Sequence, residues 1–285
     1  MPDDIDILLD GPLFCAALLA AQEWGYSAAD VTKPSVSFAL CVAAREAVNP
    51  WDGDYDATIH RILARRKNIR SFAKAVLNQP GLAWWSSPLA KRSQARVSGH
   101  LADSAGIISS THAQSPIPVL VTSTYMGGDT CWDALTSEHV GDEEPDPSPT
   151  RTLLDVDSNS RVFEIDSAES WYELVQRYPS PSPGAERGSM SPDWQAVVQD
   201  WDGVHLSLMG FLAGTHVPEG SGHERTTLWT WDGEQTRWFR DVFRSTTQVP
   251  AASHKERAQH SRRPLRFLDP LREGSPASRP LARDQ

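Results

Sequence analysis

The residues with the clearest potential for acid/base chemistry lie around His205, in the second half of the chain. Asp202 precedes this histidine by three positions, and a nearby carboxylate can fix the tautomer of an imidazole and raise its basicity. His205 stands between Val204 and Leu206 in a predicted strand, however, where residues three apart point to opposite faces. This geometry favours a structural histidine over a catalytic one.

An enzyme is nevertheless the alternative hypothesis, with a site assembled between two domains. Its acid/base candidates are His205, Asp202 and Asp193, and Arg237 is the candidate for orienting an anionic substrate. A concave pocket that holds His205 beside a carboxylate would favour the enzyme. A buried His205 together with a flat exposed tryptophan patch would favour binding instead.

Thr122-Ser123-Thr124, on a predicted strand, resembles the strand motif of ADP-ribosyltransferases, whose hydroxyl groups support a nicotinamide pocket. The resemblance implies NAD chemistry, but that family also needs a Glu-x-Glu or Gln-x-Glu triplet downstream. No such triplet follows Thr124, and Glu164-Ile165-Asp166 is a poor substitute. ADP-ribosyl transfer is therefore kept only as a distant alternative.

Other signatures of cofactor or metal chemistry are missing from the chain. It contains no G-x-S-x-G elbow, no Walker A loop and no G-x-G-x-x-G after a strand. His216 and His223 lie in a predicted Gly/Ser-rich loop without a neighbouring Cys or a second liganding pair. We expect neither a metal nor a cofactor.

Tryptophan is unusually frequent, with 11 Trp against 5 Tyr, and it is enriched at recognition surfaces. The leading hypothesis is therefore a binding or interaction protein without chemistry of its own. Its partner is an unknown protein or small molecule. The candidate binding residues are Trp84, Trp85, Trp229, Trp231, Trp238 and Arg237.

The end of the chain is basic, whereas the rest is acidic. Residues 244–285 contain nine Lys or Arg against four Asp or Glu, about +5, which leaves about −15 for the remainder of a chain of net charge −10. Such an acidic body argues against a groove for nucleic acid and leaves only weak contacts by the tail. The Ser-, Pro-, Arg- and Gln-rich composition of the tail predicts disorder.

The cysteines and the first apolar stretch indicate the compartment. Cys15, Cys41 and Cys131 are odd in number and widely spaced, without C-x-x-C, so neither a disulfide framework nor a zinc ribbon is expected. The apolar residues 13–21 follow an acidic start and are too few to span a bilayer. We expect a cytoplasmic protein without a signal peptide or membrane anchor.

The elements that position these residues begin with helices. Apolar residues recur at helical spacing over 12–24, 34–49 and 54–77, and Pro or Gly bounds the segments. These features predict a helical domain over residues 1–88.

A connecting region is predicted over residues 89–150. β-Branched residues indicate strands at 106–109 and 117–124, before an acidic, Pro-rich linker. Residues 151–243 follow as a Trp-rich α+β domain with predicted strands at 161–165 and 204–209.

Two capped helices are predicted within this second domain, near Asp166 and near Ser191-Pro192. The last element of the domain is a predicted β-hairpin over residues 226–240 that turns at Asp232-Gly233.

Both possible registers of this hairpin place Trp229, Trp231 and Trp238 on one face, as core or as a binding platform, and core is favoured. The fold class expected is α+β: a helical N-terminal domain followed by a smaller mixed strand/helix domain with a C-terminal β-hairpin.

Several short motifs resemble a group of uncharacterised proteins from high-GC actinobacteria, and the resemblance spans most of residues 10–243. The group implies a shared fold and no established activity. It carries an Arg-, His- and Asp-rich segment before the Pro-Asp-Trp motif, whereas residues 181–191 here are mainly Pro, Ser and Gly. The motifs are Asp10-Gly11-Pro12, Trp84-Trp85-Ser86-Ser87-Pro88, Val162-Phe163-Glu164-Ile165, Pro192-Asp193-Trp194, Asp202-Gly203-Val204-His205-Leu206 and residues 228–239.

Overall fold

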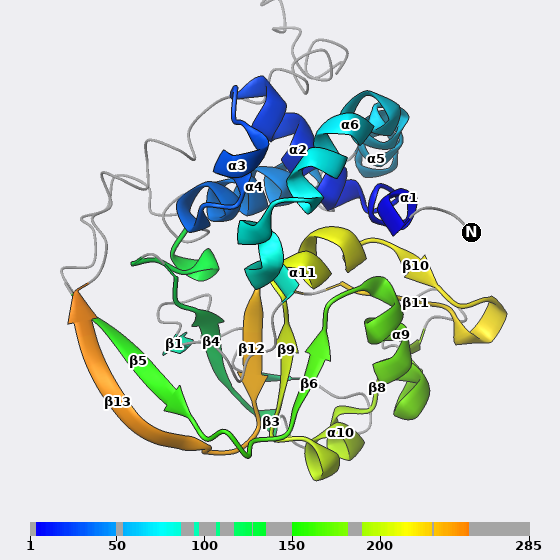
Figure 1. Ribbon diagram of the computed structural model, residues 1–285. Coiled ribbons are helices and arrows are strands. Elements are labelled where there is room, and N and C mark those ends of the chain that lie inside the picture. The colour runs from blue at the N-terminus through cyan, green and yellow to red at the C-terminus, as the bar shows by residue number, and fades with distance from the viewer. Residues whose placement is uncertain are drawn as a thin grey trace, which may run out of the picture.

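The chain folds into a helical layer that lies across one end of a seven-stranded sheet, an α+β architecture (Figure 1). This confirms the predicted fold class, with a helical N-terminal part followed by a strand-rich part. The computed structural model describes residues 4–49, 54–86, 94–96, 107–108, 117–126, 128–134, 150–181, 190–229 and 231–250.

The helical layer is centred on one helix of small and apolar residues, α2, which packs on α4 and contacts α5 and α6. Proline at the first turn of α2 and of α4 suits a helix start, because its missing N–H would have no partner there. The predicted third helix is two helices divided at Arg65. The elements are α1 (Asp4–Leu8), α2 (Pro12–Glu23), α3 (Ala28–Val31), α4 (Pro34–Ala47), α5 (Tyr55–Ala64), α6 (Arg66–Leu77) and the 3₁₀ segment η1 (Pro80–Ser86).

The main sheet has the order β13-β5-β1-β4-β12-β9-β6. Its neighbours are antiparallel except β6 and β9, which run parallel with Glu164 beside His205. The strands are β1 (Gln94–Arg96), β4 (Leu120–Thr124), β5 (Thr150–Val156), β6 (Val162–Ile165), β9 (Gly203–Leu206), β12 (Gln235–Trp238) and β13 (Phe243–Pro250).

Three short ribbons accompany this sheet. They are β2 (Ile107–Ile108) with β3 (Ile117–Pro118), β7 (Pro179–Pro181) with β8 (Met190–Pro192), and β10 (Pro218–Glu219) with β11 (Thr226–Thr227). Extended structure at β2, β3 and β4 confirms the strands predicted at 106–109 and 117–124.

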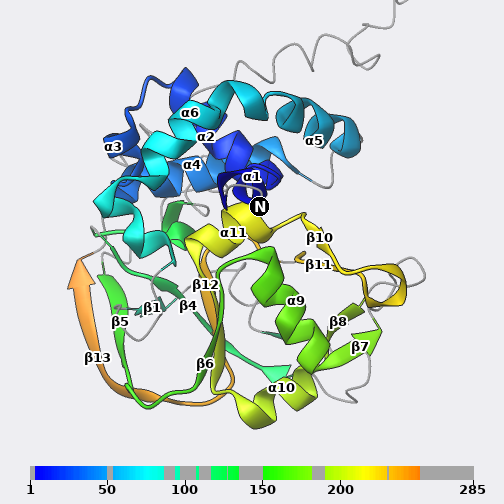
Figure 2. The same ribbon diagram turned by 45° about the vertical axis from the view of Figure 1, so that its right-hand side comes forward.

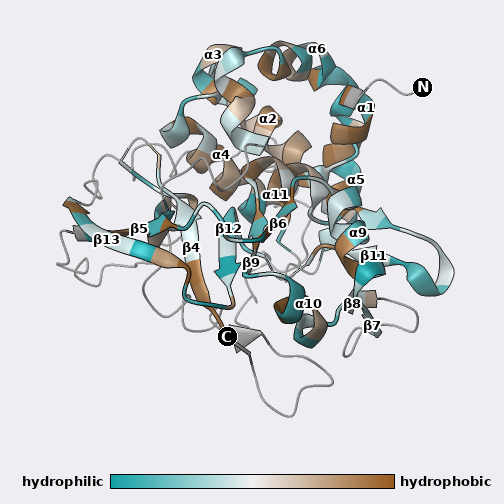
Figure 3. Ribbon diagram, turned by 60° about the horizontal axis from the view of Figure 1, so that its bottom comes forward, coloured by the Kyte–Doolittle hydropathy of each residue, from teal (hydrophilic) through white to brown (hydrophobic). Residues whose placement is uncertain are grey.

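Further helices among the described residues are α9 (Ala168–Arg177), α10 (Trp194–Asp200) and α11 (Leu208–Gly214), together with the 3₁₀ segment η3 (Gly222–Glu224) and a helical turn at residues 131–134. α9 lies against β6, and α11 lies between the helical layer and the sheet (Figure 2). The same hydrophobic core includes residues of α2, α4, α9, α10 and α11 together with Ile165, Val204 and Leu206 of the sheet. In Figure 3, α2, α4 and α11 carry much of the hydrophobic colour.

The predicted hairpin over residues 226–240 does not form. β12 pairs with β9 on one side and β4 on the other, whereas Thr226 and Thr227 pair with β10. Because β9 and β4 occupy both edges of β12 and pair its backbone groups, no edge remains for the segment before Asp232-Gly233.

The chain beyond Arg244 begins as a strand instead of the predicted disordered tail. β13 pairs with β5 from Phe243 to Pro250, although most of its residues are exposed. Backbone pairing at a sheet edge does not require an apolar composition, and composition alone therefore misses it. The rest of the predicted tail, residues 251–285, lies outside the described residues, as does Trp51.

Gly210 generates a prediction about the junction between α11 and the sheet. A Cβ at this position would collide with the carbonyl oxygen of Ile165 and lie 2.9 Å from its carbonyl carbon, both of them backbone atoms. Gly210→Ala should therefore lower the free energy of unfolding by about 3 kcal/mol.

Gly25→Ala is the matched control, because its Cβ would meet no atom within 4 Å and only its φ of +76° is unfavourable. It should cost about 1 kcal/mol. Urea denaturation of both variants measures the difference, and equal losses would contradict the close packing at Gly210.

Candidate functional site

His205 lies within β9, and its side chain is fully buried. Its Nδ1 is 2.5 Å from Glu164 Oε2, and its Nε2 is 3.2 Å from Glu234 Oε1. Glu164 reaches the ring because β6 and β9 run parallel and place these two residues side by side. Carboxylates therefore engage both ring nitrogens, and we call this arrangement the Glu164–His205–Glu234 bridge.

Glu234, the residue before β12, is fully buried, and hydrogen bonds from β4 hold its carboxylate. The Ser123 hydroxyl donates to Oε2 at 2.5 Å, and the Thr124 hydroxyl donates to Oε1 at 2.7 Å. The Thr124 backbone N–H donates to the same carboxylate. The hydroxyls of the Thr122-Ser123-Thr124 motif are thus used within the protein, and the NAD pocket that they suggested stays a prediction.

The polar network continues across the sheet through residues that are all buried. The Gln94 side-chain amide donates to Thr124 Oγ1 at 3.1 Å, and its Oε1 accepts the Thr122 hydroxyl at 2.7 Å. Trp238 Nε1 donates to Thr122 Oγ1 at 2.9 Å. Together with the bridge, these bonds connect β6, β9, β12, β4 and β1.

Burial and hydrogen bonding oppose one another in setting the charges of the bridge. Burial disfavours the charged imidazole, but the hydrogen bonds to Glu164 and Glu234 outweigh it and raise the pKa of His205 to about 9. Burial also disfavours the Glu234 carboxylate, yet His205, Ser123 and Thr124 hold its pKa below the usual value. At neutral pH, His205 is therefore an imidazolium between carboxylates.

This charge state limits the chemistry available to His205. A general base needs a nitrogen that can take a substrate proton at hydrogen-bond distance, and both nitrogens of this ring already serve carboxylates. Within the bridge, His205 and Glu234 have fully buried side chains, whereas that of Glu164 is 30% exposed. Glu164 is the member that could exchange a proton with a bound molecule.

Asp202 and Asp193, the predicted acid/base partners of His205, are held by other groups. Asp202 pairs with Arg240 at 2.8 Å, and Asp193 caps α10 by accepting the Gln195 N–H at 3.0 Å. The carboxylates that contact His205 are therefore those of Glu164 in β6 and Glu234 before β12, and not those of the predicted Asp202 and Asp193. Only the strand pairing brings these positions together, and no sequence spacing relates them to the histidine.

Arg237, the predicted contact for an anionic substrate, is buried, with its guanidinium carbon 4.1 Å from the centroid of the Trp231 ring. Burial lowers its pKa to about 10, which leaves it charged at neutral pH. The structure therefore places this cation over an interior tryptophan.

Most of the predicted binding tryptophans are also interior. Trp85, Trp231 and Trp238 are buried and Trp84 is half-buried, whereas Trp229 is 41% exposed. The prediction that three of them share a face is wrong. Trp238 and Arg237 are consecutive on β12 and point to opposite faces, and Trp231 lies against Arg237.

The exposed Trp229 forms an aromatic group with the half-buried Tyr55 and His216, which we call the Trp229 cluster. The ring centroid of Trp229 is 4.9 Å from that of His216 and 5.9 Å from that of Tyr55. His216 has a φ of +66°, a left-handed conformation that is uncommon for a non-glycine residue. The sequence placed His216 in a flexible loop and gave no signal for this contact with the first turn of α5.

The protonation of the Trp229 cluster follows from its burial. Burial lowers the pKa of His216 to about 4 and raises the pKa of the Tyr55 phenol above its usual value. The Tyr55 hydroxyl forms a hydrogen bond with Nδ1 of a neutral His216 at 2.8 Å, and the tautomer of the ring sets which of the two groups donates.

No known protein family, curated protein or solved structure matches this chain significantly. The resemblance to the actinobacterial group therefore stays a prediction. In the described part of the chain, no helix has the length and apolar character needed to cross a membrane. The same residues contain no group of three or more His, Cys, Asp or Glu side chains that could hold a metal ion.

The bridge predicts a specific dependence of stability on alkaline pH. Because the pKa of His205 is raised to about 9 in the folded state, its contribution is fully present below about pH 6.5 and is lost as the pH rises through 9. The loss should reach about 3 kcal/mol. His205→Gln should abolish this slope and destabilise the protein by about 3 kcal/mol or more at pH 7.

Urea denaturation between pH 6 and 8.5 measures both effects, below the range in which the buried thiols of Cys15 and Cys131, whose pKa is also raised, add a slope of their own. His60→Gln, at an exposed histidine on α5, is the control and should retain the slope. A slope between pH 6 and 8.5 that persists in His205→Gln would contradict the assignment of His205 as a buried imidazolium.

Proposed function

We propose that this protein is a non-catalytic binding protein that recognises a partner protein through the Trp229 cluster. The observation that carries the proposal is the 41% exposure of Trp229 on a chain whose predicted chemical centre, His205, is closed on both nitrogens. Exposed tryptophans that are held in place are frequent hot spots of protein interfaces.

The surroundings of Trp229 support recognition because they hold the indole before a partner arrives. His216 N–H donates to Leu228 O at 3.3 Å, and Thr215 forms a bridge with Leu228, so the two segments of the cluster are tied together. Tyr55 joins them from α5. Such preorganisation reduces the entropy lost on binding, and a strained backbone at His216 is typical of functional positions.

The cluster favours a partner that presents a flat ring with a nearby hydrogen-bond acceptor. The indole supplies a surface for stacking, and the tautomer of His216 that carries its proton on Nε2 supplies a donor. Proline and aromatic side chains of a protein, each beside its backbone carbonyl, meet both requirements. The acidic body disfavours nucleic acid as the partner. We place the protein in the cytoplasm, where its three free, buried cysteines match a reducing compartment.

Trp229→Ala should weaken binding of the partner by about 30-fold or more while costing about 1 kcal/mol of stability. The measurement is quantitative capture from a native extract, followed by titration of the captured protein against each variant. Ile7→Ala removes the other large hydrophobic side chain that is exposed among the described residues and should leave binding unchanged. A partner that binds Trp229→Ala as tightly as the wild type would contradict the proposal.

An enzyme remains a second candidate because the Glu164 carboxylate is both 30% exposed and hydrogen-bonded to His205. In that case Glu164 would act as the acid or base, with His205 as its positioning partner. Glu164→Gln should then abolish conversion of a metabolite in a mass-spectrometric screen, and Trp229→Ala should not. The binding proposal expects no conversion by the wild-type protein.

A further inference from the structure

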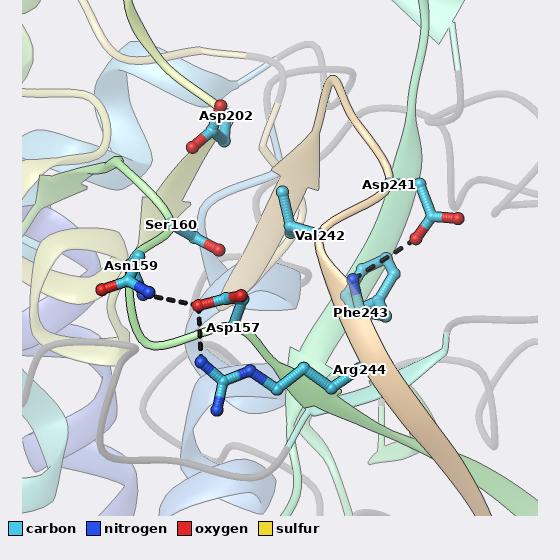
Figure 4. A pocket seen from close by; sticks show the side chains of 8 residues that line it. All are labelled: Asp157, Asn159, Ser160, Asp202, Asp241, Val242, Phe243 and Arg244. Carbon is cyan, nitrogen blue, oxygen red and sulfur yellow. Dashed lines mark hydrogen bonds and ion pairs between the residues drawn. The ribbon is translucent and has the colours of Figure 1, made fainter.

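A second site lies away from the Trp229 cluster, as a pocket at the turn between β5 and β6 (Figure 4). Its volume is about 470 Å³, within the range of small-molecule sites. It is lined by Asp157, Asn159 and Ser160 of this turn, by Asp202 after α10, and by residues 241–244 at the start of β13. Three segments that are distant in sequence thus contribute to one concave surface.

Negative charge exceeds positive charge around this pocket. Arg244 Nη2 is 2.7 Å from Asp157 Oδ1, and the two groups compensate one another. Asp202 is likewise compensated by Arg240. Asp241 accepts the backbone N–H of Phe243 at 3.3 Å and is paired with no cation among the described residues. One carboxylate charge is therefore in excess, and it attracts a cation and repels an anion.

The pocket also offers a hydrogen-bond acceptor and an apolar wall. The Ser160 hydroxyl oxygen is buried and has no partner among the described residues, and its side chain points into the pocket (Figure 4). An unpaired buried polar group of this kind costs free energy, which a donor from a ligand would relieve. Phe243 lies edge-to-face against Trp238 with ring centroids 5.4 Å apart, which fixes the orientation of its ring.

We propose that this pocket binds a small organic monocation, an alkylammonium or alkylguanidinium group. Its N–H donates to the Ser160 hydroxyl, its charge is attracted by the uncompensated carboxylate of Asp241, and its alkyl stem packs on Phe243. A free amine and a Lys or Arg side chain of a peptide both supply this chemistry. The excess charge is single, and the site therefore selects monocations over anions and over neutral analogues of the same shape.

The test is a ¹H–¹⁵N NMR titration of the full chain at low salt with n-butylammonium, ethylguanidinium, n-butyrate and 1-butanol. The two cations should shift the amides of Asn159, Ser160 and Phe243 saturably, with a Kd on the order of a few millimolar. Butyrate and butanol should not. The tripeptide acetyl-Gly-Lys-Gly-amide separates the two sources: tighter binding than n-butylammonium assigns the site to a protein side chain, and equal or weaker binding assigns it to a free amine.

Two variants locate the site. Ser160→Ala and Asp241→Asn should each weaken cation binding by about fivefold, because one removes the acceptor and the other removes the excess charge. Glu173→Gln, on the exposed face of α9, makes the same change of charge as Asp241→Asn away from the pocket and should leave binding unchanged. Shifts that are equal for butyrate, shifts that do not saturate, or an affinity unaffected by both pocket variants would overturn the proposal.

Discussion

The Glu164–His205–Glu234 bridge is the interaction on which the sheet depends. The side chains of His205 and Glu234 are fully buried, where water does not compensate an unpaired charge, and loss of either one therefore leaves the other uncompensated in the interior. Each member belongs to a different chain segment: β6, β9 and the residue before β12. The bridge therefore requires the parallel pairing of β6 with β9 and fixes the residue that leads into β12.

The two characterised histidines show how the partner, and not burial alone, decides the charge of a ring. His205 has carboxylates on both nitrogens and is held as a cation, whereas His216 has only the Tyr55 hydroxyl on Nδ1 and is held neutral. Both nitrogens of the charged His205 ring are used in hydrogen bonds within the sheet. The neutral ring of His216 lies beside the exposed Trp229, and we therefore assign recognition to the surface around Trp229.

Much of the local structure could be predicted from the sequence, because it depends on local signals. Proline at helix starts and apolar spacing located α2 and α4, and the strand at Val162–Ile165 followed from its apolar residues. The geometric objection to a pair formed by Asp202 and His205 also agrees with the structure. Ser167 and Asp193 cap α9 and α10 at positions shifted by one or two residues from those expected.

The remainder depends on pairings between distant segments. Glu164 and Glu234 carry no spacing signal relative to His205, because parallel strands and a sheet-interior position for β12 bring them together. The Asp232-Gly233 turn suggested a local hairpin because a turn can be recognised in the sequence, whereas the pairing of β12 with the distant β4 and β9 cannot. Without that hairpin, Trp229 does not share a face with Trp231 and Trp238. Those two side chains are buried, and Trp229 is the exposed indole among the predicted binding residues that the structure describes.

The most direct measurement of the central claim is the protonation state of His205 by ¹⁵N NMR of the imidazole nitrogens in the native protein. The account predicts that both nitrogens carry a proton at pH 7 and that the ring titrates near pH 9. A neutral His205 ring at pH 7, with a pKa at or below 6.5, would contradict the bridge and the functional assignment built on it.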